Sequence, residues 1–252
     1  MKLKDFLENP AGKGDSSLNR AALRNLLDSK YENLIKNKGD KIKLTIYHQI
    51  GDVYYIHMVF PSETARENTY DVVVCFSPDL EIKGQHMSLL HTHNVTFFCN
   101  APSFAYTFAK VYRDNGLFIE SLKHKFPKEI YGNDPEIRNR YGIVNYDKYL
   151  YFGCKYIYES HIVNKSTIGL RSVLYTPQVL DLKVRNLDRI MIDYKKAKNK
   201  LDKDRKDSVQ QKVDKAYRHK HPVKAGIKEI KKHKAVKPVA TKSAIKKHKP
   251  KN

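Results

Sequence analysis

The distribution of charge along the chain limits how much of it can fold into a packed core. The 252-residue sequence has a formal net charge of +21. Residues 1–182 hold 23 basic and 20 acidic side chains (net +3), whereas residues 183–252 hold 25 basic and 7 acidic ones (net +18). A segment with so much charge of one sign and few apolar side chains cannot bury enough surface to offset the entropy lost on folding. We therefore expect one hydrophobic core, confined to roughly the first 180 residues.

The C-terminal part of the chain, from residue 176 onward, is expected to contain a helix and a tail. Thr176-Pro177 is a typical helix start, because threonine can cap a first turn and proline fits its geometry. Apolar side chains then recur at heptad-like steps: Leu180, Val184, Leu187, Met191, Tyr194 and Leu201. From residue 219 to the end there are twelve lysines, one acid and no aromatic residue. We expect a long basic helix over residues 176–218 and a disordered tail over residues 219–252.

The first 38 residues predict an arm followed by a helix. Asn9-Pro10, Gly12 and Gly14 are typical of irregular chain, so residues 1–16 are expected to form an N-terminal arm. Residues 17–38 are expected to be helical, with Ser17 as cap and Gly39 after the last turn. The apolar face predicted for this helix consists of Leu18, Ala21, Ala22, Leu26, Leu34 and Ile35.

Strand patterns occupy the next part of the chain. Residues 41–60 alternate in polarity around Gly51-Asp52, which favours a β-hairpin closed by a tight turn of two residues and ended by Pro61. Residues 70–76 are almost wholly apolar, which is typical of a central strand covered on both faces. Residues 92–99 predict a fourth strand.

Helical spacing returns after Pro102. Phe104, Phe108, Val111 and Tyr112 predict an amphipathic helix with an aromatic buried face. A short helix or strand is expected at 117–125 and an ordered loop at 128–143, and residues 145–159 favour a helix, with a strand as the alternative. The predicted fold class is therefore α+β: an antiparallel sheet with flanking helices over residues 17–175, then a long basic C-terminal helix and a disordered lysine-rich tail.

Several classes of protein are not expected from this composition. The longest apolar run, Val72–Phe76, is far shorter than the roughly 20 residues that span a bilayer. The first eight residues have no apolar segment behind their charges, so no secretory signal is expected. Cys75, Cys99 and Cys154 lie far apart among apolar neighbours, which predicts buried, reduced thiols.

The lysine-rich tail has the clearest functional signal. Its composition resembles that of linker-histone and ribosomal-protein extensions, which predicts binding to nucleic acid without sequence preference. An acidic protein, an anionic membrane surface, or no dedicated ligand are the alternatives. The residues predicted to contact nucleic acid are Lys220, Lys224, Lys228, Lys231, Lys232, Lys234, Lys237, Lys242, Lys246, Lys247, Lys249 and Lys251.

Catalytic and metal-binding patterns are weak. His86, His91 and His93 lie close together in the sequence. Only Glu81 and Cys99, or His48 and His57 if their strands pair suitably, could complete a set of metal ligands. All five histidines are therefore interpreted as ordinary strand or loop residues. Asp71, Asp79 and Glu81 would have to converge to support a metal-dependent nuclease. No nucleophile or phosphate-binding motif is present. We expect no enzymatic activity, catalytic residue, metal or cofactor.

Aromatic residues are concentrated in two blocks, at 97–112 and 146–158. Core packing is the first interpretation of such blocks. So many tyrosines are not expected to point inward together, and tyrosine is favoured in protein interfaces. This density therefore predicts an oligomeric or assembly contact as well.

Two segments that overlap the aromatic blocks also resemble known proteins. Asn94–Ala109 (NVTFFCNAPSFAYTFA) and Tyr141–Phe152 (YGIVNYDKYLYF) are similar to segments of structural proteins from tailed bacteriophages. The resemblance implies a non-enzymatic capsid or tail assembly protein of a virion, made in the host cytoplasm, homo-oligomeric and docked to other virion proteins. The alternative is a ribosome-associated or other RNA- or DNA-binding protein whose folded domain itself binds nucleic acid. The small charge of residues 1–182 favours the first interpretation.

Overall fold

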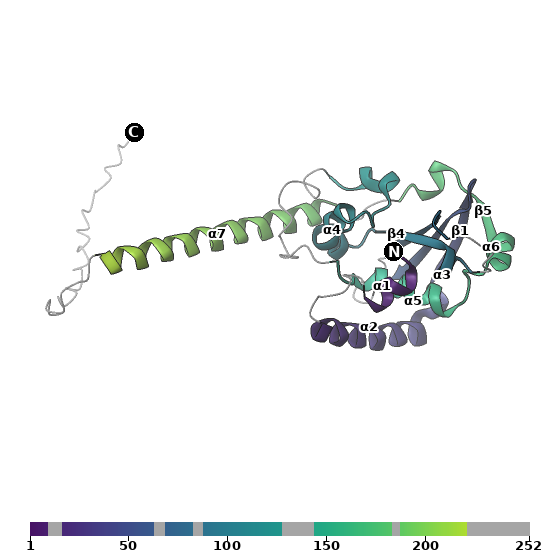
Figure 1. The fold of residues 1–252 in the computed structure, drawn as a ribbon, viewed down its shortest axis with the longest axis horizontal. Helices are drawn as coiled ribbons and strands as arrows, with labels where there is room; N and C mark the ends of the chain where they lie inside the picture. The colour runs from purple at the N-terminus through teal and green to yellow at the C-terminus, as the bar shows by residue number, and fades with distance from the viewer. Residues whose placement is uncertain (10–16, 63–68, 83–87, 128–143, 183–186, 221–252) are drawn as a thin grey trace, which may run out of the picture. The chain divides into compact units, whose positions relative to one another are not determined.

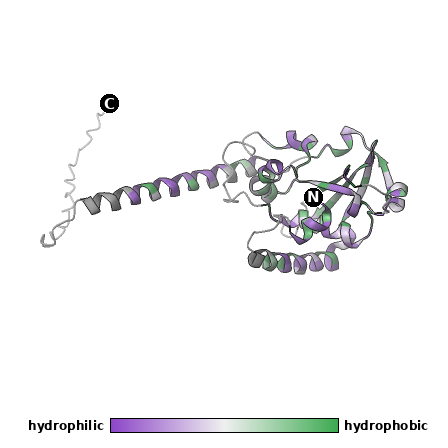
Figure 2. Cartoon of the chain, viewed as in Figure 1, coloured by the Kyte–Doolittle hydropathy of each residue, from purple (hydrophilic) through white to green (hydrophobic). Residues whose placement is uncertain are grey.

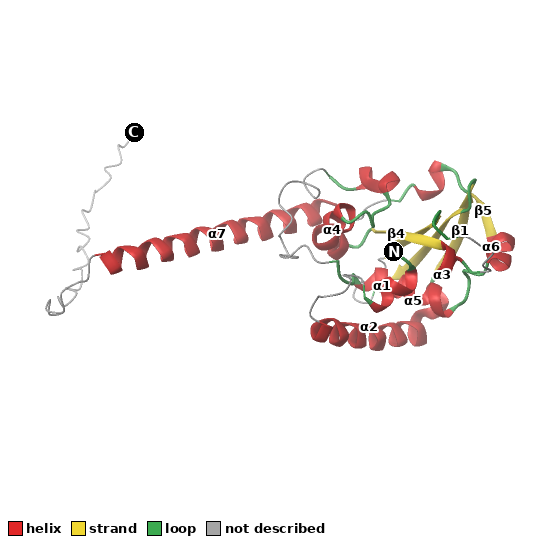
Figure 3. Ribbon diagram, in the orientation of Figure 1, coloured by secondary structure: helices red, strands yellow, loops and turns green. Residues whose placement is uncertain are grey.

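A five-stranded mixed sheet with flanking helices forms the centre of the computed structural model (Figures 1 and 3). The structure describes residues 1–9, 17–62, 69–82, 88–127, 144–182 and 187–220. The strand order is β4-β3-β2-β1-β5. The strands are β1 (Lys43–Gln49), β2 (Val53–Pro61), β3 (Thr69–Pro78), β4 (His93–Cys99) and β5 (Ser172–Leu174). The expected α+β class is confirmed.

The hairpin of β1 and β2 forms where the alternating pattern predicted it. Gln49 pairs with Val53, so three residues connect the strands rather than two. Gly51 and Asp52 have φ angles of +92° and +58°, a left-handed conformation that glycine and aspartate tolerate better than most residues. Nε2 of His93 lies 2.9 Å from the carbonyl oxygen of Asp52, which ties this turn to the start of β4.

Strand β3 has neighbours on both sides and is covered on both faces, as its apolar run predicted. Val72, Val73, Val74 and Phe76 have no exposed surface. The expectation of a wholly antiparallel sheet is wrong, because β5 pairs in parallel with β1. A strand of three residues has too short a pattern to be recognised in the sequence.

One face of the sheet is covered by α5 (Lys148–Glu159), which in turn contacts α1 (Leu3–Glu8) and α2 (Ser17–Lys38) (Figure 1). Asp147 caps α5: its Oδ1 accepts hydrogen bonds from the amides of Tyr149 and Leu150, at 3.1 and 3.3 Å. Ser103 donates to the other carboxylate oxygen at 2.6 Å. The helical interpretation of residues 145–159 is confirmed.

Helix α1 corrects the expectation of an N-terminal arm. Leu3 and Phe6 have no exposed surface, and the Phe6 ring lies 4.5 Å from that of Phe97. Leu3, Phe6 and Leu7 share one face of a helix, but a single turn is too short to stand out beside Asn9-Pro10.

The helix predicted over residues 17–38 is present as α2, but it buries a different stripe from the one expected. Leu27, Tyr31 and Leu34 are buried, whereas the side chain of Leu26 is 53% exposed. Asp28 joins α2 to α5: its Oδ1 accepts hydrogen bonds from Tyr151 Oη at 2.7 Å and from Lys155 Nζ at 2.6 Å. These contacts orient α2 against α5.

The helix predicted after Pro102 consists of a π-helical segment, Phe104–Phe108, and α4 (Ala109–Asp114). Its buried face is aromatic, as expected, with Phe104 and Tyr112 fully buried. The following residues run along the outer edge of β4, where the amide of Phe97 donates to the carbonyl of Leu117 at 2.8 Å. A 3₁₀ helix, η3 (Glu120–Lys125), comes next, and the loop expected at 128–143 lies outside the described residues.

The long helix expected from residue 176 begins later. Pro177–Leu180 forms a short 3₁₀ helix, and α7 spans Leu187–Lys220. Two short helices, α3 (Leu89–Thr92) and α6 (Lys165–Arg171), flank the strands. The chain divides into two units, Met1–Asp204 and Arg205–Asn252. In the part of the chain that the structure describes, no helix has the length and apolar character needed to cross a membrane.

Candidate functional site

The lysines predicted to bind nucleic acid fall almost entirely outside the described residues. Lys220 is the last residue of α7. Lys224, Lys228, Lys231, Lys232, Lys234, Lys237, Lys242, Lys246, Lys247, Lys249 and Lys251 belong to residues 221–252, which the structure does not describe.

Helix α7 continues the cationic character of the chain upstream of these lysines. Figure 2 shows mainly hydrophilic residues along the part of α7 that it colours. Its exposed cations in the described part include Lys195, Lys196, Lys198, Lys200, Lys203, Arg205, Lys206 and Lys212. Asp204 and Asp207 lie among them and reduce the local positive potential.

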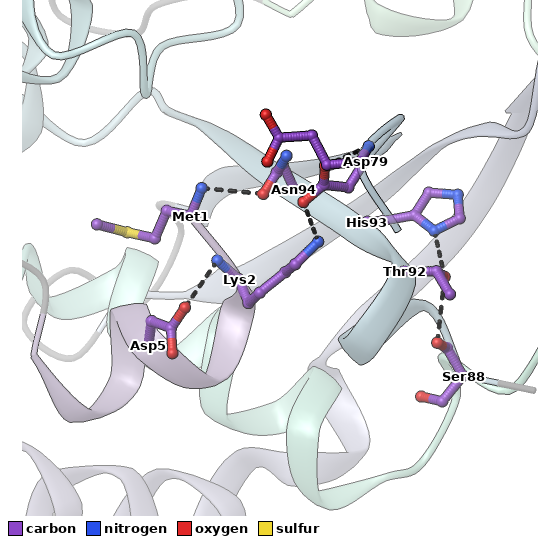
Figure 4. Close-up of polar contacts among 9 residues, drawn as sticks. Met1, Lys2, Asp5, Asp79, Ser88, Thr92, His93 and Asn94 are labelled. Atoms are coloured by element: carbon purple, nitrogen blue, oxygen red, sulfur yellow. Dashed lines mark hydrogen bonds and ion pairs between the residues drawn. The ribbon is translucent and has the colours of Figure 1, made fainter. Parts of the chain in front are cut away.

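His91 and His93 do not form a shared site. His91 is exposed, whereas His93 is 2% exposed and held on both ring nitrogens. Its Nδ1 lies 2.7 Å from Thr92 Oγ1 (Figure 4). Its Nε2 lies 2.9 Å from the carbonyl oxygen of Asp52. Burial lowers the pKa of His93 and outweighs the opposing hydrogen bond to Asp52. His86 lies outside the described residues.

A polar cluster at one end of the β2–β3–β4 part of the sheet joins His57, Asp71 and Asn100. His57 Nε2 lies 2.9 Å from Asp71 Oδ1, and Asn100 Nδ2 donates to Asp71 Oδ2 at 2.6 Å. The Asp71 amide donates back to Asn100 Oδ1 at 2.8 Å. A carboxylate held in this way orients an imidazole, as in many general bases. Thr45, which pairs with His57 on β1, is the nearest hydroxyl by register, and no hydrogen bond between them is present among the described contacts. We interpret the cluster as a polar clamp between strands.

The carboxylates that a nuclease would need do not converge. Asp71 lies near the start of β3 and Asp79 just beyond its end, so about 26 Å of strand separates them. Asp79 binds Lys2 Nζ at 2.7 Å (Figure 4). Glu81 is exposed, and its amide donates to Asp79 Oδ1. In the described ranges no group of three or more histidine, cysteine, aspartate or glutamate residues is placed to hold a metal ion.

The N-terminal residues contact the same region. The amino group of Met1 donates to Asn94 Oδ1 at 3.0 Å (Figure 4). The Val95 amide donates to the carbonyl oxygen of Met1 at 2.9 Å. Together with the Lys2–Asp79 ion pair, these contacts attach the chain before α1 to β4.

Most of the aromatic residues serve the core rather than an interface. Tyr146, Tyr149 and Tyr151 are at most 5% exposed, so the expectation that many tyrosines face outward is wrong for them. Tyr146 Oη donates to the carbonyl of Leu7 at 2.7 Å, which shows how a tyrosine can be buried with its hydroxyl satisfied. Tyr158 alone in this block is exposed by more than a third. Cys75, Cys99 and Cys154 are buried free thiols, as predicted.

Exposed apolar side chains occur in α6 and β5, among other places. Leu170, Val173 and Leu174 are 90%, 57% and 58% exposed. Strand β5 is at the end of the strand order and contains no charged residue. Uncharged edge strands with exposed apolar residues are typical contact sites for other chains.

Sequence reasoning also missed a polar stripe on α2. Lys30, Asn33, Asn37 and Lys38 line a surface groove with Leu34. Their spacing of three and four residues is visible in the sequence, but apolar periodicity, which orients a helix against the core, gives no signal for such a polar stripe.

Comparison of the chain with protein-family models, with curated proteins and with solved structures found no significant match.

Proposed function

We propose that this chain is a non-enzymatic structural or assembly protein of a phage virion, which binds nucleic acid without sequence preference through its basic C-terminal segment. The folded part docks to protein neighbours. The observation that carries the proposal is the segregation of charge: a net +18 over residues 183–252 against +3 over residues 1–182.

The chemistry of the C-terminal segment supports nucleic acid as its ligand. Each lysine that neutralises a phosphate releases condensed counterions, so the binding constant falls steeply with salt and depends little on base sequence. The segment beyond residue 218 has no arginine and no aromatic residue. Planar recognition and base stacking therefore contribute little there.

Two features of the folded part support docking to protein. Its small net charge is weak for a surface dedicated to RNA. The exposed apolar residues Leu170 in α6 and Val173 and Leu174 in the edge strand β5 suit contact with another protein. The resemblance of residues 94–109 and 141–152 to tailed-phage structural proteins supports a virion as the setting.

The proposal is tested with a full-length variant in which the eleven lysines between 224 and 251 are replaced by glutamine. Binding of wild type and variant to labelled duplex DNA is measured across a salt titration. The wild type is expected to show a steep linear dependence of log K on log salt, with a slope of about −0.9 for each phosphate contacted. The glutamine variant is expected to lose most of this slope and to keep the wild-type size in sedimentation.

A matched control keeps the eleven lysines but scrambles the order of residues 221–252. If electrostatic attraction alone binds the DNA, this control binds like the wild type. Wild-type slope and affinity in the glutamine variant would contradict the proposal. Tight and selective binding of that variant to a structured RNA would favour the alternative, in which the folded domain itself reads nucleic acid.

A further inference from the structure

A groove of about 320 Å³ runs along one side of α2. Lys30, Asn33, Leu34, Asn37 and Lys38 line it. They lie at positions i, i+3, i+4, i+7 and i+8, so they form one stripe over two helical turns. The groove thus offers two ammonium groups and two carboxamides beside a single apolar residue.

The fold holds this stripe in place. Leu34 is 4% exposed and anchors the helix in the core. Lys38 Nζ donates a hydrogen bond to the carbonyl oxygen of Ser62, 2.8 Å away, which ties the end of α2 to the end of β2. Asn37 Nδ2 donates to the carbonyl oxygen of Asn33 at 2.9 Å, so one carboxamide lies along the helix.

The chemistry of the lining selects an anion. Among the residues that the structure describes, no carboxylate lines the groove. Glu32 lies about 200° around the helix from Lys30 and faces away from the stripe. Asp28 is already bonded to Tyr151 and Lys155. Lysine ammonium and carboxamide groups together are typical contacts for phosphate oxygens.

We propose that this groove binds the phosphate backbone of the same nucleic acid that the C-terminal lysines contact. Lys30 and Lys38 are about 12 Å apart along the helix axis, whereas a DNA strand has one phosphate per about 3.4 Å, so the two lysines meet different phosphates. The inference rests on the proposed function, and it adds a second, ordered contact on the folded domain. Because this contact is to the backbone, it carries no base preference.

The test is lysine acetylation of the full-length protein at low salt, read residue by residue by mass spectrometry, with and without a short oligothymidylate. Lys36 is the internal control, because it is exposed on the same helix, does not line the groove in the described residues and lies about 120° around the axis from Lys30. At an oligonucleotide concentration about ten times Kd, acetylation of Lys30 is expected to slow about tenfold, since only about one groove in eleven remains open. Lys36 is expected to react at its original rate.

The same spectra separate this inference from the proposed function. Protection of the lysines between 224 and 251 without protection of Lys30 would overturn the groove and leave the proposed function standing. Protection of Lys30 alone would support the groove and contradict the role of the tail. Absence of protection at both places would contradict both. Equal protection of Lys30 by polyglutamate would overturn the assignment to nucleic acid.

A pair of variants gives a second measurement. Lys30→Ala is expected to reduce the magnitude of the salt slope by about 1, because one phosphate contact is lost. Lys36→Ala removes the same charge from a position of α2 that is not among the lining residues of the groove, and it is expected to leave the slope unchanged. Equal slopes for the two variants would contradict a groove-specific contact.

Discussion

Gly153 lets α5 lie directly against the sheet. A Cβ atom added at this position would lie 2.8 Å from Cε of Met58 and 2.8 Å from Cγ1 of Val72. The methionine end can move aside, but a β-branched side chain in a buried strand has few other rotamers. The closeness of helix and sheet therefore depends on the absence of one methyl group.

Gly153→Ala is expected to lower the free energy of unfolding by about 1–3 kcal/mol, reduced by the better helix propensity of alanine. Gly169→Ala is the matched control, because Gly169 lies in α6 and its Cβ would meet nothing within 4 Å. This control is expected to raise stability by up to about 1 kcal/mol. Urea unfolding measures the free energy of unfolding of both variants. An unchanged value for Gly153→Ala would show that the Val72 side chain can move to accommodate the added methyl group.

The buried His93 makes stability depend on pH. Because burial lowers its pKa below the ordinary value of 6.5, the unfolded chain takes up a proton at this residue before the folded chain does. The contribution of neutral His93 is therefore present above about pH 6.5 and is lost as pH falls toward its lowered folded value. We expect His93→Gln to flatten the decline in unfolding free energy between about pH 7 and 5. Urea unfolding at several pH values measures this, and parallel pH profiles for the two proteins would contradict the assignment.

At the scale of elements, α1 shows how a short segment can matter to the whole core. The Phe6 ring lies within 6.3 Å of the rings of Phe97, Tyr112 and Tyr146. It thereby joins β4 to α4 and to the residues that precede α5. A helix of six residues has little stability of its own, so these tertiary contacts hold it.

Phe6→Ala is expected to lower the free energy of unfolding by about 3–5 kcal/mol, because it removes a fully buried ring and leaves a cavity. This is a large part of the roughly 5–15 kcal/mol typical of a whole domain. Lys4→Ala on the same helix is exposed and is expected to change stability by less than about 0.5 kcal/mol. Thermal unfolding followed by circular dichroism compares them, and equal midpoints would mean that α1 does not contribute to the core.

At the scale of the whole molecule, folded and unfolded forms are expected to differ in how they bind a polyanion. A ligand that contacts only the C-terminal tail binds both forms equally and does not change stability. A ligand that also occupies the α2 groove binds the folded form better, because the groove exists only when α2 is packed.

Oligothymidylate is therefore expected to raise the midpoint of thermal unfolding of the full-length protein, by the equivalent of about 2.7 kcal/mol at one hundred times the Kd of the groove. The same oligonucleotide is expected to raise the midpoint of Lys30→Ala much less, and that of Lys36→Ala as much as the wild type. A wild-type midpoint that does not respond to saturating oligonucleotide would mean that binding involves the tail alone.

Local sequence patterns were sufficient for much of this fold. The hairpin around Gly51-Asp52, the apolar strand β3, and helix α5 all follow from residues that are neighbours in the chain, since side-chain periodicity and turn conformation are local properties. The concentration of lysine after residue 218 is likewise a property of composition, and the proposed contact with nucleic acid depends on it.

Only the tertiary structure decided which local patterns meet. Three features depend on contacts between residues far apart in sequence. They are the parallel pairing of β5 with β1, the burial of Phe6, and the burial of Leu27 and Tyr31 rather than Leu26 on α2. The same holds for the α2 groove, whose lysines look like any solvated helix face until packing of Leu34 and the bond from Lys38 to Ser62 set their direction. The periodicity of apolar residues indicates that a helix has a buried face, but the element that packs against the helix determines which face is buried.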